Sequence, residues 1–161
     1  MIRPLTPQDH PALLEIINDA AGAYKGVIPE DRWHEPYFSP ADLAQALGEG
    51  VEFHGLEAAG ALQGVMGVQD RGDVALIRHA YVRTALRGRG VGGQLLTWLT
   101  ARQTRPVLIG TWAAADWAIR FYQKHGFKLV DGEAKDALLR KYWNIPQRQV
   151  ETSVVLTNSA I

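Results

Sequence analysis

Apolar and polar residues alternate along this chain with two different periods, and each period predicts one kind of element. Apolar positions three and four apart, together with residues that start or stop helices, predict five helices. These helices span residues 7–22, 40–47, 90–102, 116–125 and 134–142. Short apolar or alternating runs between glycine, proline and aspartate residues predict strands. These strands span residues 2–5, 51–58, 61–69, 74–82, 107–111, 127–130 and 150–156.

The order of the predicted elements favours a layered α/β domain. Residues 51–69 read as an antiparallel hairpin that turns at Gly60, and strands then alternate with helices. The chain, residues 1–161, has a length that suits one core. Because no repeat or low-complexity linker divides it, we expect a single domain with a mixed sheet.

Composition and charge narrow the classes of function. The chain is 47% hydrophobic and 21% charged, and its 17 Lys and Arg residues balance 17 Asp and Glu residues. Zero net charge gives no long-range attraction to nucleic acid or to an anionic membrane, and no apolar run approaches the ~20 residues that cross a bilayer. The absence of cysteine excludes disulfides, thiolate metal sites and a cysteine nucleophile. We expect a cytoplasmic protein that binds no metal, nucleic acid or membrane.

A cluster of glycines and arginines separates strand 74–82 from helix 90–102. The N-terminus of a helix carries free N–H groups and a partial positive charge, so it binds phosphate groups where side chains leave room. Glycines clear that approach, and the arginines add positive charge. A tight turn without a ligand is the alternative, and it accounts poorly for this composition. The candidate diphosphate-binding residues are Leu86, Arg87, Gly88, Arg89, Gly90, Val91, Gly92 and Gly93.

Three anion-binding motifs compete for this cluster. A P-loop ends in Gly-Lys-Ser or Gly-Lys-Thr, which the cluster lacks. Its glycine spacing fits Gly-x-Gly-x-x-Gly, so an NAD-dependent oxidoreductase is an alternative. That fold also requires an acidic residue after the next strand, where this chain has Thr111-Trp112-Ala113. The third motif, Gln or Arg followed by x-x-Gly-x-Gly or Ala, is met by Arg87, Gly90 and Gly92.

A second segment agrees with the third motif. It reads Ala118-Ile119-Arg120-Phe121-Tyr122-Gln123-Lys124-His125-Gly126-Phe127 and follows the glycine cluster by one helix and one strand. Together the two segments resemble the GNAT superfamily of N-acetyltransferases, whose later helix and turn carry Ala-x-x-x-Tyr-x-Lys-x-Gly-Phe. The resemblance covers about residues 2–156. It implies a GNAT-like α/β fold with a splayed mixed sheet of about seven strands, flanked by four to five helices.

The resemblance also implies a reaction. Acetyl-CoA would supply an acetyl group to a primary amine of a small molecule or peptide, and the lack of cysteine favours direct attack in a ternary complex. The pantetheine arm would lie between strands 74–82 and 107–111, with main-chain contacts at Ala80, Tyr81 and Val82 and a further contact at Ala118.

Two residues are candidates for catalysis. Tyr122 occupies the family's general-acid position, and a phenol with a pKa of about 10 is protonated at neutral pH; packing on its helix face is the alternative. His79 lies on the strand beside the expected thioester, and its reference pKa of about 6.5 suits a base, although a lone histidine in an apolar strand is commonly structural. Weaker candidates for the base are Glu52, Asp70 and Glu151.

In the resembling family, the segment between the first two helices borders the acceptor. The candidate acceptor-binding residues of this chain are Tyr24, Ile28, Trp33, Trp112 and Trp143. Aromatic side chains there predict a cavity for an apolar or flat amine; packing or a homodimer contact is the alternative. Segment 23–29 is also similar to phosphinothricin-type enzymes, which act on small amino-acid-like amines. Because Ala115 replaces a family asparagine and no base is evident, a non-catalytic acyl-CoA sensor remains an alternative.

Overall fold

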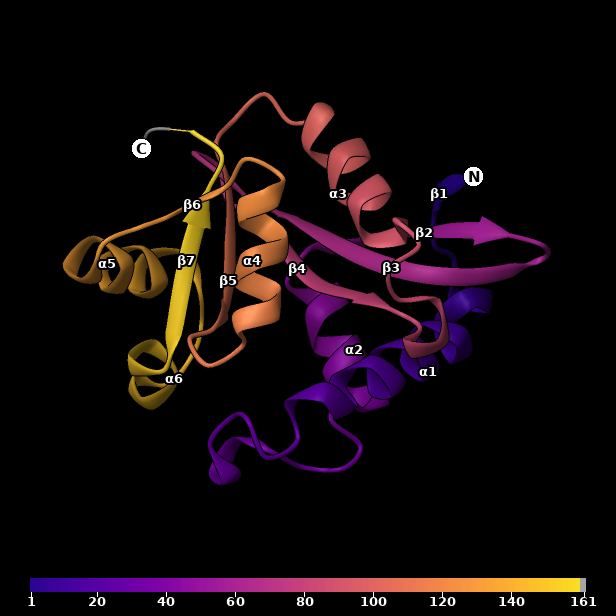
Figure 1. The fold of residues 1–161 in the computed structure, drawn as a ribbon, viewed down its shortest axis with the longest axis horizontal. Helices are drawn as coiled ribbons and strands as arrows, with labels where there is room; N and C mark the ends of the chain where they lie inside the picture. Colours follow the sequence, from indigo (N-terminus) through magenta and orange to yellow (C-terminus); the bar gives the residue numbers. More distant parts are fainter. Residues whose placement is uncertain (160–161) are drawn as a thin grey trace.

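Seven strands form one mixed sheet with helices against both faces in the computed structural model, which describes residues 1–159 (Figure 1). The strands are β1 (Ile2–Pro4), β2 (Val51–Ala58), β3 (Ala61–Asp70), β4 (Ala75–Val82), β5 (Val107–Trp112), β6 (Lys128–Leu129) and β7 (Ser153–Thr157). The helices are α1 (His10–Ala21), α2 (Pro40–Gly48), α3 (Val91–Ala101), α4 (Asp116–Lys124), α5 (Gly132–Tyr142) and α6 (Gln147–Glu151). The order β1-β2-β3-β4-β5-β7-β6 confirms the predicted mixed α/β sheet of seven strands.

Different helices cover the two faces of the sheet. On one face, α3 and α4 pack over a core that includes Met66, Ile77 and Leu95. On the other face, α1 and α2 pack against β2 and β3, and α5 and α6 pack against β4, β5 and β7. Successive side chains of a strand point to opposite faces. Accordingly, Leu76 packs with the residues of α5, whereas Ile77 packs with those of α3.

The two central strands are neighbours over only part of their length. Ala75, Leu76 and Ile77 of β4 pair in parallel with residues 107–109 of β5. Beyond Ile77, β4 continues along β3, while β5 continues along β7. Figure 1 shows β5 standing beside β7, β4 running off with β3, and α4 lying across the gap between them. The sheet is therefore splayed at its centre, as the resemblance implies.

The C-terminal part of the chain differs from the sequence prediction. The strand predicted over residues 150–156 begins only at Ser153, because residues 147–151 form α6 and bury Val150. A short apolar run does not by itself distinguish a strand from a buried helical turn. With α6 included, the described part of the chain has six α-helices, against the four to five predicted.

An ion cluster links the first strand to β2. Arg3 donates to both carboxylate oxygens of Asp9 at 2.8 and 2.9 Å, and to Oε1 of Glu57 at 2.8 Å. The hydrogen bonds from Arg3, followed by one from the N–H of Thr6, hold the pKa of Asp9 well below its usual range. A lowered pKa stabilises the folded state above the unfolded pKa of about 3.9, and this contribution is lost as the pH falls.

We expect Asp9→Asn to lower the Tm by a few degrees at neutral pH and to flatten the further loss of Tm below about pH 5, because the variant has no carboxylate to protonate. Thermal melts across this pH range measure both effects. Asp31→Asn is the matched control, since Asp31 forms an exposed pair with Arg148 at 3.0 Å, and such pairs contribute little. Parallel acid profiles for Asp9→Asn and the unchanged protein would contradict the role of the cluster.

Candidate active site

A β-bulge in β4 shapes the gap between β4 and β5. The pairing of β3 with β4 shifts register between Val65 and Gly67, so β4 carries one extra residue there. His79 lies at this bulge with a φ of 55°, a left-handed conformation that is uncommon outside glycine. A bulge re-aims the side chains that follow it. After it, Ala80 packs with the core under α3 and α4, whereas Tyr81 packs with the core under α1 and α2.

Beyond the bulge, β4 exposes its backbone edge to the gap before β5. The parallel pairing ends at Ile77 and Ile109, so Ala80, Tyr81 and Val82 have no partner strand on that side within residues 1–159. An extended ligand can pair with such an edge in the way that an added strand would. The predicted main-chain contacts of the pantetheine arm thus fall on an available edge.

The loop after β4 leads into the glycine-rich start of α3. Gly88 and Gly90 have φ values of 78° and 80°, and a Cβ at either would meet no atom closer than 3.9 Å. Gly90 is the N-cap of α3 and offers no capping side chain, so the first N–H groups of the helix are free to bind an anion. Arg87 and Arg89 are exposed beside it, without an ion-pair partner among the described residues.

The remaining residues of the cluster have packing roles. Val91 is buried in the core under α3, and Leu86 ends a 3₁₀ turn just before the loop. A Cβ at Gly92 would lie 3.3 Å from Cζ of Phe121, and one at Gly93 would lie 2.8 Å from Nε2 of His125. These two glycines therefore let α3 and α4 touch. Their pattern in the sequence predicts a role in the diphosphate approach and does not indicate this contact.

Tyr122 lies on α4 with its ring buried between neighbouring aromatics. Its side chain is 7% exposed, and its ring centre is 5.2 Å from that of Phe121 and 6.2 Å from that of Phe127. Burial, with a smaller contribution from Tyr24, raises its pKa above the usual value. The phenol is therefore protonated at neutral pH, as a general acid requires. Ala118, one turn earlier, packs against the same core.

An aromatic cavity opens on the opposite side of the central strands from α3 and α4. Its inner part has a volume of about 140 Å³ and lies among β4, β5 and the segment before α6. Its outer part, of about 250 Å³, extends to α2 and to the loop before it. Seven residues line both parts and make them one cavity: Tyr37, Arg78, His79, Tyr81, Trp112, Ile145 and Gln149. The indole N–H of Trp112 donates to the hydroxyl of Tyr37 at 3.3 Å.

Three of the five predicted acceptor residues border this aromatic cavity. They are Tyr24, Trp112 and Trp143. Ile28 is buried behind Trp112, and Trp33 stacks on Tyr37 with ring centres 5.5 Å apart, so neither reaches the lining.

Sequence reasoning missed Arg78 and Tyr37 as lining residues. The signal for Arg78 was a charged residue inside an otherwise apolar strand. The signal for Tyr37 was its place among the aromatic residues between the first two helices. Trp143 closes the inner part over Gly110, where a Cβ would lie 3.0 Å from the indole.

His79 also lines the aromatic cavity, but its setting weakens the case for a base. Its ring centre lies 4.8 Å from that of Phe38 and 5.8 Å from that of Phe53. Burial, followed by the nearby charge of Arg78, lowers the pKa of His79 to about 3. So weak a proton acceptor suits a structural role better than proton abstraction at neutral pH.

The weaker base candidates lie elsewhere. Glu52, Asp70 and Glu151 are all exposed, and none lines the cavity.

Within residues 1–159, no group of three or more His, Asp or Glu side chains is placed to hold a metal ion. No helix in the same range combines the length and apolar character needed to span a membrane.

Comparison with known proteins identifies a family. Residues 49–129 match the family described as the acetyltransferase (GNAT) domain. This stretch runs from just before β2 to the end of β6, so it contains the bulged β4, the glycine cluster and α4. No curated protein sequence matches the chain.

Solved structures of similar fold cover nearly all of the chain. The PaiA N-acetyltransferase from Thermoplasma acidophilum in complex with coenzyme A is 18% identical, covers 99% of this chain and 98% of its own, and has a TM-score of 0.72. The ribosomal-protein-S18-alanine N-acetyltransferase from Escherichia coli is 19% identical and has a TM-score of 0.66, and the match covers 98% of this chain and 91% of that protein. A GNAT family acetyltransferase from Elizabethkingia anophelis with acetyl-CoA bound is 21% identical and has a TM-score of 0.64, and the match covers 99% of this chain and 97% of that protein.

Proposed function

Because this chain belongs to the GNAT family of acetyltransferases, we propose that it transfers the acetyl group of acetyl-CoA to a primary amine of a small molecule or peptide. One observation carries the proposal. The splay between β4 and β5 lies between the glycine-rich start of α3 on one side and the aromatic cavity on the other. A donor and an acceptor can therefore approach the same strand edge from opposite sides and meet there.

The donor side is assigned to groups that suit an extended anionic ligand. The free N–H groups at the start of α3, with Arg87 and Arg89, would bind the diphosphate. The open edge at Ala80, Tyr81 and Val82 would pair with the amide groups of the pantetheine arm. The similar structures from Thermoplasma acidophilum and Elizabethkingia anophelis, which contain coenzyme A and acetyl-CoA, support this assignment.

The transfer itself requires few protein groups. Acetyl-CoA supplies a thioester, which is an activated acetyl donor. The acceptor nitrogen attacks the thioester carbonyl, a main-chain N–H near the end of β4 stabilises the developing oxyanion, and the C–S bond breaks as the C–N bond completes. The hydroxyl of Tyr122 donates a proton to the departing sulfur, the proton released by the nitrogen passes to water, and water returns a proton to the Tyr122 phenolate. Direct attack in a ternary complex agrees with the absence of cysteine.

We expect acetyl-CoA at about 100 times its Kd to raise the Tm by about 5–10 °C, because binding to the folded state alone stabilises it. Differential scanning fluorimetry with acetyl-CoA, and with NAD as a comparison ligand, measures this shift. Gly90→Ala and Gly60→Ala form a matched pair, since both glycines have positive φ values, of 80° and 78°, and only Gly90 lies at the predicted site. Only Gly90→Ala should reduce the shift.

Release of free CoA with a panel of amines then distinguishes the candidate functions. Turnover with at least one amine is expected of the transferase. Binding of acetyl-CoA without turnover across a broad panel would favour the acyl-CoA sensor, for which Ala115 at the α4 N-cap is the supporting observation. If saturating acetyl-CoA produced neither a thermal shift nor heat in calorimetry, the proposed function would be wrong.

A further inference from the structure

The inner part of the aromatic cavity has an unusual charge balance. Among residues 1–159, Arg78 is the only charged residue that lines it. Nη1 of Arg78 donates to the amide oxygen of Gln69 at 3.1 Å, and the nearest carboxylate, that of Glu49, lies 3.9 Å away. Glu49 borders only the outer part. A half-buried guanidinium therefore faces the inner part with its charge incompletely neutralised, because 3.9 Å exceeds hydrogen-bonding distance.

A second guanidinium borders the outer part. Nη2 of Arg32 donates to Oε1 of Gln149 at 3.2 Å, and Nε of Arg32 is buried without a partner in the described part of the chain. A buried donor without an acceptor costs free energy, so an acceptor from water or from a ligand would stabilise it. Asp42 also borders this part, but its Oδ2 already accepts from the N–H of Ser39 at 2.9 Å. Two guanidinium groups thus border the cavity, and the two carboxylates that border it, those of Asp42 and Glu49, both lie in the outer part.

This charge balance constrains the acceptor. An amine enters from water largely as an ammonium ion, and an ammonium without other charge would meet the guanidinium of Arg78 with no carboxylate in the inner part to offset it. A carboxylate on the same molecule removes that penalty and provides the missing acceptor. We propose that the acceptor is an amine that carries a carboxylate, and that Arg78, assisted by Arg32 and Gln149, binds this carboxylate. This inference rests on the proposed acetyltransferase function.

A panel of amino acids, each compared with its own amide, tests the inference. In an α-amino acid amide the amine is less basic than in the acid, so a larger share is neutral and able to attack. Preference for the acid therefore cannot arise from ionisation of the amine. We expect kcat/KM for CoA release to be about 10- to 100-fold higher for the preferred acid than for its amide. Equal values, or a preference for the amide, would overturn the inference.

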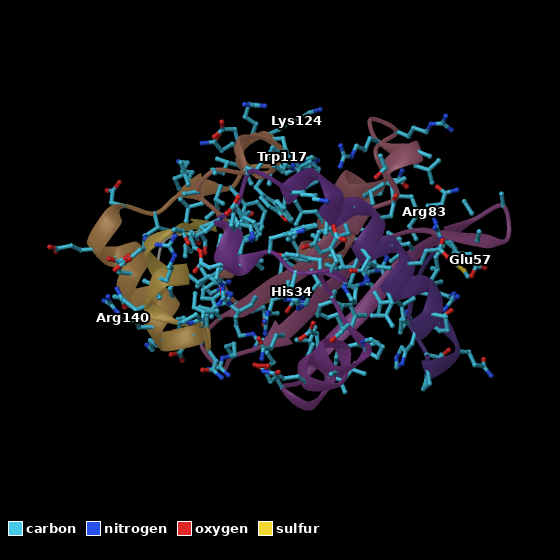
Figure 2. The ribbon with its side chains drawn as sticks, turned by 90° about the horizontal axis from the view of Figure 1, so that it is seen from below. His34, Glu57, Arg83, Trp117, Lys124 and Arg140 are labelled. Carbon is cyan, nitrogen blue, oxygen red and sulfur yellow. The ribbon has the colours of Figure 1, made fainter. Side chains whose placement is uncertain are left out.

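Variants assign the preference to particular groups. Arg78→Gln should bring the ratio of acid to amide to one or below, because only the greater neutral share of the amide then remains, and Arg32→Gln should lower it in part. Arg140→Gln is the control, since Arg140 lies on α5 at one end of the molecule, well away from His34 at the cavity mouth (Figure 2). If Arg78→Gln does not fold, Arg32→Gln and the comparison of acid with amide in the unchanged protein still test whether the cavity binds the carboxylate. An unchanged ratio in both cavity variants would overturn the assignment.

A binding measurement separates this inference from the proposed function. Calorimetry of acid and amide against the protein saturated with CoA reports recognition without turnover. If no amine released CoA, the proposed function would fail, while tighter binding of the acid would still support the carboxylate site. If turnover occurred and the acid bound no more tightly than the amide, the proposed function would stand and the carboxylate inference would fail.

Discussion

Replacing Gly93 with valine is expected to lower the rate of CoA release by at least about tenfold and the Tm by roughly 2–10 °C. A Cβ at Gly93 would lie 2.8 Å from Nε2 of His125. The ring of His125 cannot easily turn aside, because its Nδ1 lies 2.9 Å from the carbonyl oxygen of Phe121 and its ring packs on the Phe121 ring, with centres 4.7 Å apart. Valine would therefore push α4 away from α3. That displacement moves Tyr122 and changes the loop that is proposed to bind the diphosphate.

Two further variants separate steric pressure from other effects at Gly93. Gly132→Val is the control, because Gly132, like Gly93, lies in the first turn of a helix, but a Cβ there would have no atom within 4 Å. It should keep the Tm and the rate close to those of the unchanged protein. Adding His125→Ala to Gly93→Val relieves the clash and should recover part of both losses. A rate and Tm for Gly93→Val that match the unchanged protein would show that the contact between α3 and α4 tolerates the larger residue.

Most of the fold could be predicted because its signals are local. The period of the apolar positions marked every strand and five of the six α-helices, and Gly60 marked the hairpin turn. The helix over residues 147–151 was missed for a physical reason: it has five residues, and tertiary packing of Val150 rather than a periodic pattern determines its conformation. The apolar residues that follow it continue into β7, so the two elements read as one run.

The candidate site was harder to predict because it is assembled from distant segments. Tyr37, Arg78 and Gln149 come from the loop before α2, from β4 and from α6, and no spacing in the sequence brings them together. Gly92 and Gly93 carried a clear signal whose cause was ambiguous, since the same lack of a side chain serves a ligand approach or a helix contact. The pKa of His79 likewise depends on burial that only the packed structure contains.

Replacing Tyr122 with phenylalanine is expected to lower kcat by about 10- to 100-fold while changing the Kd for acetyl-CoA much less. The hydroxyl makes no hydrogen bond to the rest of the described chain, so its removal leaves the packing of the ring intact. It would act only when the sulfur departs and needs a proton. Because a thiolate is a fair leaving group, the effect should lie at the lower end for general acid catalysis. Single-turnover rates and calorimetry of acetyl-CoA binding measure the two quantities separately.

The control for this prediction is Tyr142→Phe, because Tyr142, the last residue of α5, is also 7% exposed but packs with Leu76 and Leu139, and its hydroxyl donates to Asp73 at 3.5 Å, away from the proposed site. It should leave kcat unchanged. The pH profile adds a second criterion. Since burial raises the pKa of Tyr122 above its usual value of about 10, loss of its proton should not reduce the rate between about pH 7 and pH 10. A kcat for Tyr122→Phe equal to that of the unchanged protein would remove the acid role and leave the ring as a packing element of α4.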